Sequence, residues 1–299
     1  MLDWKVFTQE IAPSKADIVI DFVQIDSDHQ LGLFHHQTQK ILYFGFIQCA
    51  SISQLPSLIQ AIEDIANRRG CKKIIGPIDG ATWANYRFQS SIQIQNKYPG
   101  QPTYSADWAN IFLKYNYKVS ETYETVQIDQ IEQARQELLT FKEIELPDLQ
   151  FIKPTKEYVT SHVSQFQQVL NEVFTENYQF SEMTITETKI LFSNLLNLIN
   201  YDFSLVIIDK NNEIVGFMLN YTIDDTLYLK TIGIKKLFRY QGLTVFKMLE
   251  TILGSKELSY QGRIKNIVIC LMKKDNFPSL LAKYFNGQKN EYVLLEKTL

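Results

Sequence analysis

Hydrophobic and polar positions in the first half of the chain switch between two periods. Segments 16–25 and 40–49 are rich in β-branched and aromatic residues, which predicts strands. Residues 53–70 instead place leucine and isoleucine at helical spacing and end at Gly70 after two arginines, which predicts a helix. The other elements expected in this half are a short buried strand at 71–80, a helix at 106–117 and a strand at 118–128.

A polar-faced helix at 132–148 contains a proline near its end, and a strand restarts directly afterwards at 149–154, so we expect a domain boundary near residue 148. Thr184 with Glu187 behind it predicts a capped start for the second helix of the following half. The elements expected there are helices at 157–177 and 184–200, strands at 203–209, 214–223 and 226–234, a helix at 242–254, a strand at 265–272, a short helix at 277–287 and a last strand at 291–298.

The two halves share part of this order of elements. Strand, helix, strand, helix, strand closes the second half, and the same run occupies 40–128 of the first. The alternation predicts a mixed α/β protein, and the shared run of elements looks like a structural duplication into two tandem domains, 1–148 and 149–299.

Composition narrows the function classes. The formal net charge of −3 gives no basic field for nucleic acid or an anionic membrane. Three widely spaced cysteines, Cys49, Cys71 and Cys270, predict buried thiols rather than a disulfide framework. No apolar run approaches the roughly 18 residues that cross a bilayer, and the first residues do not resemble a signal peptide, so we expect a cytoplasmic protein.

Residues 234–249 place two lysines, an Arg-Tyr-Gln-Gly turn and an apolar helix directly after a strand. A helix that opens on a glycine-bearing turn presents unpaired N–H groups and the positive end of its dipole to an anion such as a phosphate. An ordinary turn with a solvated basic patch, Lys235, Lys236 and Arg239, is the competing interpretation.

The strand ending at Ile234, the turn Arg239-Tyr240-Gln241-Gly242-Leu243-Thr244 and the helix behind it resemble the signature of the GNAT superfamily of acyl-CoA N-acyltransferases. Thr244 departs from the glycine or alanine of that signature but still offers a hydroxyl donor. Asn276 and Ser279 are similar to the family's stretch after the next strand. The first half resembles a second GNAT domain whose seam, 47–58, lacks the glycine, so the chain is similar to a tandem GNAT-like bacterial protein with a degenerate N-terminal domain.

The resemblance implies that each domain is a mixed, mostly antiparallel sheet flanked by helices. It also implies acetyl-CoA or another acyl-CoA as co-substrate, no metal, and transfer of the acyl group to an amine by direct attack in a ternary complex. The pantetheine arm of this co-substrate would lie along the strand segment 230–234, before the turn 239–244, where a main-chain N–H would polarise the thioester carbonyl. The cofactor-binding residues implied are Ile232, Gly233, Ile234, Arg239, Tyr240, Gln241, Gly242, Leu243, Thr244 and Asn276.

Acyl transfer to an amine needs a base for the nucleophile and an acid for the departing thiolate. By position relative to the family, Tyr284 is the candidate acid, with a packed aromatic residue as the alternative. Asp224 and Tyr228 are the candidate bases, although Asp224 also fits a plain turn residue. The resemblance places the acceptor site near the exit of the helix at 157–177, where the candidates are Asn171, Phe174 and Tyr178.

The loop at 76–88 gathers glycine, proline, aromatic and charged residues after a strand, so Trp83 and Arg87 are candidate substrate-binding residues and Asp79 a third residue to test. His29, His35 and His36 could suggest a metal, but neighbouring histidines on a strand point to opposite faces, so we expect surface histidines.

The acceptor is then a small-molecule amine, with no nucleic acid or membrane partner, in a monomer or homodimer. Two alternatives stay open. A non-catalytic GNAT-like sensor or scaffold is favoured by Thr244 and by the lack of a compelling base. An aminoacyl-tRNA-dependent transferase shares tandem GNAT-like folds, but it needs a basic groove and no CoA loop.

Overall fold

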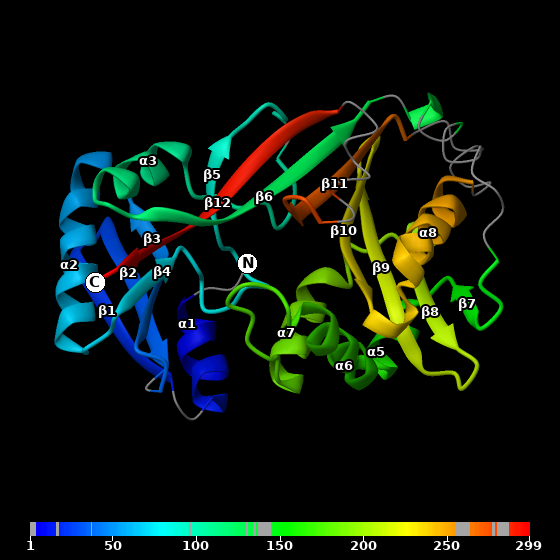
Figure 1. The fold of residues 1–299 in the computed structure, drawn as a ribbon, viewed down its shortest axis with the longest axis horizontal. Coiled ribbons are helices and arrows are strands. Elements are labelled where there is room, and N and C mark those ends of the chain that lie inside the picture. Colours follow the sequence, from blue (N-terminus) through cyan, green and yellow to red (C-terminus); the bar gives the residue numbers. More distant parts are fainter. Residues whose placement is uncertain are drawn as a thin grey trace. The chain divides into compact units, whose positions relative to one another are not determined.

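The computed structural model describes residues 4–15, 18–36, 38–95, 97–129, 131–133, 136, 145–254, 264–276, 279 and 287–299 (Figure 1). The chain forms two compact units: Met1–Tyr123 with Asn290–Leu299, and Glu124–Lys289. The division falls between Tyr123 and Glu124 rather than near residue 148, and the last strand belongs to the first unit. Most of the helices expected at 132–148 and 277–287 lies outside the described residues.

The first unit is a mixed sheet in the strand order β1-β2-β3-β4-β12, with β5 also paired to β12. The pairs are antiparallel except β3 with β4, which run parallel because helix α2 connects them. The elements are α1 Trp4–Val6, β1 Ile18–Asp26, β2 His29–His36, β3 Ile41–Cys49, α2 Leu55–Arg68, β4 Lys73–Gly76, β5 Phe88–Ser91, α3 Ala106–Lys114, β6 Lys118–Ile128 and β12 Gln288–Thr298.

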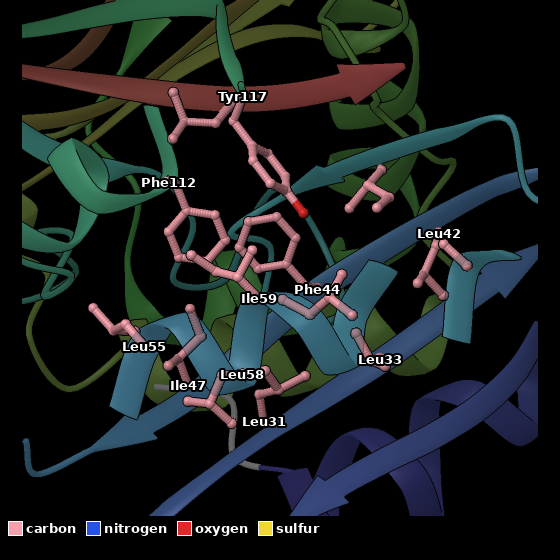
Figure 2. Close-up of a cluster of buried hydrophobic side chains, with 14 of the residues drawn as sticks. Leu31, Leu33, Leu42, Phe44, Ile47, Leu55, Leu58, Ile59, Phe112 and Tyr117 are labelled. Atoms are coloured by element: carbon pink, nitrogen blue, oxygen red, sulfur yellow. The ribbon is translucent and has the colours of Figure 1, made fainter. Parts of the chain in front are cut away.

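Alternation along β2 supplies the two faces of this sheet. Leu31 and Leu33 point into a cluster that includes α2, whereas Gly32 and Phe34 lie against the N-terminal aromatics Trp4 and Phe7. Figure 1 accordingly shows α2 and α1 on opposite sides of β1–β3. In Figure 2 the α2 side chains meet aromatic rings from β3, α3 and the residues behind α3; Phe44 and Phe112 stack with centroids 4.9 Å apart.

The second unit carries the strand order β11-β10-β9-β8-β7, with the end of β6 beside β11. Among the strand pairs of this unit whose register is described, β10 and β11 run parallel, because α8 connects them, and the other pairs are antiparallel. The elements are β7 Leu149–Ile152, α5 Lys156–Ser161, α6 Val163–Phe174, α7 Ile185–Leu195, β8 Leu205–Asp209, β9 Ile214–Ile223, β10 Thr226–Ile234, α8 Leu243–Leu253 and β11 Asn266–Lys273.

Helices cover both faces of this sheet. Phe166 of α6 packs on Phe217 of β9 and on Phe192 of α7, with centroids 5.3 and 5.4 Å away. Met218, the next residue of β9, points into the opposite cluster together with Met248 of α8. The fold is therefore the predicted mixed α/β arrangement, although the strands of the two units are part of one hydrogen-bonded sheet rather than two separate sheets.

Local signals mark several boundaries well. Thr184 and Glu187 form the predicted capping box, with Thr184 N–H donating to the Glu187 carboxylate at 2.7 Å.

Two strands were not expected, β2 and β5, and the helix expected at 157–177 is interrupted at His162. The expectation of surface histidines is wrong for His29 and His35, which are both only 8% exposed, because β2 is an interior strand.

Candidate cofactor-binding site

The parallel strands β10 and β11 pair only at their beginning. Their register runs from Thr226↔Asn266 to Leu229↔Ile269, and both strands then continue to Ile234 and Lys273. A bulge between Leu229 and Thr231 shifts the pairing of β10 with β9 at the same level. Among the described residues, the pairing of β10 with β11 therefore ends at Leu229↔Ile269, and positions 231–234 of β10 lie beyond it on an edge that an extended ligand could follow.

The predicted cofactor residues of β10 lie on this opened stretch. Ile234 is buried and Ile232 partly buried in the cluster below α8, so both serve the core. Gly233 lies between them: a Cβ built there would lie 3.3 Å from the Phe217 side chain, a tight contact that a small shift of this ring relieves, and 3.7 Å from Val173.

Two 3₁₀ turns, Lys236–Phe238 and Tyr240–Gly242, connect β10 to α8. Gly242 adopts φ 94° and ψ −9°, a left-handed conformation that glycine enters without strain, and α8 starts at the next residue. The expected glycine-bearing turn at a helix N-terminus is thus present.

Several donors of the turn are already used within it. The N–H groups of Gly242 and Leu243 donate to the carbonyl oxygens of Arg239 and Tyr240, the first at 2.8 Å. Arg239 Nε donates to the Ile234 carbonyl oxygen at 3.0 Å. The turn is therefore held in place by its own hydrogen bonds.

Thr244, the position that departs from the family signature, is fully buried, and its hydroxyl donates to the Phe238 carbonyl oxygen at 2.5 Å. The hydroxyl thus already closes the turn, which corrects the expectation that it offers a donor to a ligand. An α-helix provides no acceptor for the N–H groups of its first turn, so the amides of Thr244 and Val245 are the donors that this seam can present.

The side chains that rim the turn are basic and apolar. Lys235 lies 3.9 Å from Glu172 in the last turn of α6, and Lys236 lies 3.2 Å from Glu176 just after that helix. Tyr240 and Leu243 are 39% and 44% exposed. Nothing is described of the Gln241 side chain.

The candidate bases do not lie at the opened strands. Asp224 is exposed at the β9–β10 turn, so β10, nine residues long, separates it from Ile234 by roughly 26 Å at about 3.3 Å per residue. Tyr228 lies in the paired part of β10, buried and stacked on Tyr221 with centroids 5.0 Å apart. Burial raises the pKa of Tyr228, which keeps its phenol protonated at neutral pH and fits an acid better than a base. Tyr284 lies outside the described residues.

Asn276 follows β11, and its Oδ1 accepts the Ser279 N–H at 3.0 Å, the pattern of a helix N-cap. The Ser279 hydroxyl accepts the Asp275 N–H at 3.2 Å and donates to the buried Glu124 carboxylate, whose other oxygen lies 3.8 Å from Lys289 Nζ. Sequence reasoning missed Glu124, because no local pattern links a residue of β6 to a turn 155 positions further on.

The three acceptor-site candidates all interact with other residues of the protein. The Asn171 side-chain amide bonds Met183 twice: Nδ2 donates to its carbonyl oxygen at 3.0 Å and Oδ1 accepts its N–H at 2.8 Å. Asn171 thereby ties the loop after α6 to that helix. The Phe174 ring lies 6.3 Å from that of Phe180, and Tyr178 is half-buried on the same loop.

In the first unit, the loop at 76–88 places Asp79 and Arg87 inside the protein. Asp79 is 6% exposed and accepts hydrogen bonds from Phe46 N–H and Tyr104 Oη, both at 2.6 Å, and from Asn85 Nδ2 at 3.0 Å. Arg87 is 3% exposed and Trp83 half-buried.

Neither a metal cluster nor a membrane span is found in the part of the chain that the structure describes. No group of three histidine, cysteine or acidic side chains there could hold an ion. His29 instead lies 2.7 Å from Asp26 through Nδ1 and accepts the Ser51 N–H through Nε2. None of the described helices is long and apolar enough to cross a bilayer.

No protein-family model matches the sequence, and no curated protein matches it either. The fold is similar to that of a tandem GNAT protein from the clavulanic acid biosynthesis pathway, with a TM-score of 0.52 and 9% identity over 95% of this chain and 84% of that one. It is also similar to a GCN5-related N-acetyltransferase from Sphaerobacter thermophilus, with a TM-score of 0.51 and 10% identity over 92% of this chain and 82% of that one. At these identities the likeness is one of fold, and the chain has the tandem GNAT fold that the resemblance predicted.

Proposed function

We propose that the second unit binds an acyl-CoA, acetyl-CoA in the simplest case, and transfers its acyl group to the amine of a small molecule. The observation that carries the proposal is the separation of β10 from β11 after Leu229↔Ile269, followed by the left-handed Gly242 at the start of α8. An extended thiol-bearing arm fits along an unpaired strand edge, and a diphosphate fits the N-terminus of a helix.

When bound, the acyl-CoA supplies the activated thioester. The residues of this chain bind and orient it: the open edge of β10 aligns the arm, the Thr244 and Val245 amides meet the diphosphate, and Lys235, Lys236 and Arg239 add positive charge. Val245 enters here from the structure, because the sequence pattern stopped at Thr244.

The test is calorimetric titration of acetyl-CoA into wild type and Gly242→Glu. The glutamate replaces a left-handed glycine and puts a negative charge where the diphosphate would lie, so we expect no measurable binding. Gly70→Glu is a matched control, because Gly70 is also left-handed at φ 65° but has no atom within 4 Å of a built Cβ. Unchanged affinity in Gly242→Glu, with the fold intact by circular dichroism, would refute the placement.

One observation favours a second candidate function, an acyl-CoA sensor without catalysis. Neither Asp224 nor Tyr228 lies on the opened part of β10, so the described residues bring no candidate base to that edge. Release of thiol from acetyl-CoA across a panel of small amines separates the two functions. Binding without amine-dependent thiol release supports the sensor.

A further inference from the structure

Arg87 in the first unit is a buried cation that the proposed transfer reaction does not use. Its backbone is fixed at φ 84°, with its N–H donating to the Pro77 carbonyl oxygen at 3.1 Å. Residues 82–86 before it are half-buried, whereas the Arg87 side chain lies inside the unit.

Aromatic rings enclose the guanidinium. Its Cζ lies 3.5 Å from the ring centroid of Tyr86 and 3.4 Å from that of Tyr123, and these two rings are inclined at 80° to each other. Tyr98 and Tyr292, whose hydroxyls are 3.5 Å apart, contribute to the same surroundings. Burial lowers the pKa of Arg87 to about 9, which still leaves the group charged at neutral pH.

The charge has no anionic partner within the described protein. Arg87 Nε and Nη1 are buried and make no hydrogen bond, and no described carboxylate forms an ion pair with this side chain. A buried cation without a counter-charge is among the least favourable arrangements in a protein, and an apolar residue of similar volume would be more stable there.

Trp83 supplies a second buried donor without a partner. Its indole Nε1 is shielded from solvent and bonds nothing, although tryptophan can only donate. Trp83 and Arg87 are four positions apart on one loop. Two unrelated donors on one loop thus find no acceptor among the described residues, and a bound ligand is one source of such an acceptor.

We propose that Arg87 is the anion receptor of a ligand site in the first unit, that the ligand is a small monocarboxylate, and that the Trp83 indole N–H is an additional donor at this site. A single guanidinium matches a single negative charge better than a phosphate dianion does, and flanking tyrosine rings suit the apolar body of an aliphatic or aromatic acid. A buried water would satisfy the hydrogen bonds but not the charge.

The experiment measures Tm of the full chain by differential scanning calorimetry at pH 7 in sodium acetate, butyrate or benzoate, each against sodium chloride at equal ionic strength. No CoA is present, so the result is independent of the proposed function. We expect at least one carboxylate to raise Tm by about 3 °C or more at saturation, because a ligand that binds only the folded state stabilises it. Equal Tm in all carboxylates and in chloride would overturn the proposal and leave water as the occupant.

Variants locate the effect. Arg87→Met should abolish the carboxylate-dependent shift, and Trp83→Phe, which keeps the aromatic body, should reduce it. Arg69→Met is the matched control, because Arg69 is an exposed arginine of the same unit paired with Asp21, and it should keep the full shift. An undiminished shift in Arg87→Met would also overturn the proposal. Should Arg87→Met fail to fold, Arg87→Lys replaces it, and an undiminished shift there counts against the site equally.

Discussion

The segments β3–α2–β4 and β10–α8–β11 are two versions of one arrangement, a strand, a helix and a parallel strand, in the first and second units. In the second unit the parallel strands separate after four pairs. In the first, β3 pairs with β4 from Ile41↔Lys73 to Tyr43↔Ile75, and the chain after β4 stays against β3, with Ile78 N–H donating to the Phe44 carbonyl oxygen at 2.8 Å.

Side chains then occupy the edge of β3 that corresponds to the open edge of β10. Phe46 N–H donates to the Asp79 carboxylate, and Ile47 N–H donates to Tyr104 Oη at 3.0 Å. Tyr104 Oη in turn donates to Asp79. The strand edge is therefore capped from within the unit, and no ligand backbone or amide is needed to satisfy it.

The helix starts differ in the same direction. α2 is preceded by Gln54 in a right-handed conformation and has Pro56 in its first turn, which removes one N–H donor. α8 follows the left-handed Gly242. Closing a strand edge and losing a donor at the adjacent helix both make a seam unsuited to a nucleotide, so the comparison supports placing the acyl-CoA in the second unit alone.

The largest effect that would test this comparison comes from glycine substitutions in the two strands. A Cβ at Gly45 of β3 would lie 2.0 Å from the Ile78 carbonyl oxygen and 2.9 Å from Asp79 Oδ1, so Gly45→Ala should destabilise the first unit by more than about 3 kcal/mol or prevent its folding. Gly233→Ala in β10, where the nearest atom is 3.3 Å away, should cost about 1 kcal/mol at most.

Urea unfolding followed by tryptophan fluorescence reads the first unit selectively, because Trp4, Trp83 and Trp108 all belong to it. Circular dichroism follows both units and serves for Gly233→Ala. Similar losses in the two variants would mean that β3 is no more closed than β10.

An intermediate effect is expected from the pH dependence of the cap. Desolvation raises the pKa of Asp79 from 3.8 to about 6, although its hydrogen bonds from Tyr104, Phe46 and Asn85 act against this shift. A folded-state pKa above the unfolded value stabilises the protein fully below pH 3.8, and this contribution is lost as pH rises through about 6. The rise of the Asp79 pKa from 3.8 to about 6 corresponds to about 3 kcal/mol of unfolding free energy.

Asp79→Asn removes the titration, so the difference in unfolding free energy between wild type and variant should shrink as pH rises from 4.5 to 7.5. Tryptophan-detected urea unfolding at both pH values measures it. An identical pH dependence in the two proteins would show that Asp79 does not titrate in this range.

The same residues show which features of the site can be predicted from the sequence. The Gly242 turn and the Thr184–Glu187 capping box were predictable, because each is a local pattern within a few positions. The cap on β3 was not, because Asp79 and Tyr104 lie 33 and 57 positions from the N–H groups they accept. The missing glycine of the first seam pointed to a degenerate domain, but which side chains close it is visible only after folding.

The strand pairing within the units could not be predicted from the local sequence either. β12 ends the chain, yet it pairs with β4 and β5 in the first unit, a pairing that hydrophobic alternation cannot specify, because period two fixes a face but not a neighbour. Strand β2 was not predicted because its three histidines suggested a surface segment, although Leu31, Leu33 and Phe34 form an apolar stretch between them.

The smallest expected effect concerns Thr244, whose hydroxyl closes the turn between β10 and α8. Thr244→Ala removes the hydrogen bond to the Phe238 carbonyl oxygen and should lower the stability of the protein by about 1 kcal/mol. Acetyl-CoA affinity should stay within about twofold of wild type, since the hydroxyl is held inside the turn and the Thr244 N–H is unchanged. Calorimetric titration measures it, with Thr251→Ala as the control, because Thr251 makes a similar hydroxyl-to-carbonyl bond to Lys247 further along α8. A tenfold loss of affinity in Thr244→Ala alone would show that the hydroxyl turns to the ligand, and the second seam would then be more open than its hydrogen bonds indicate.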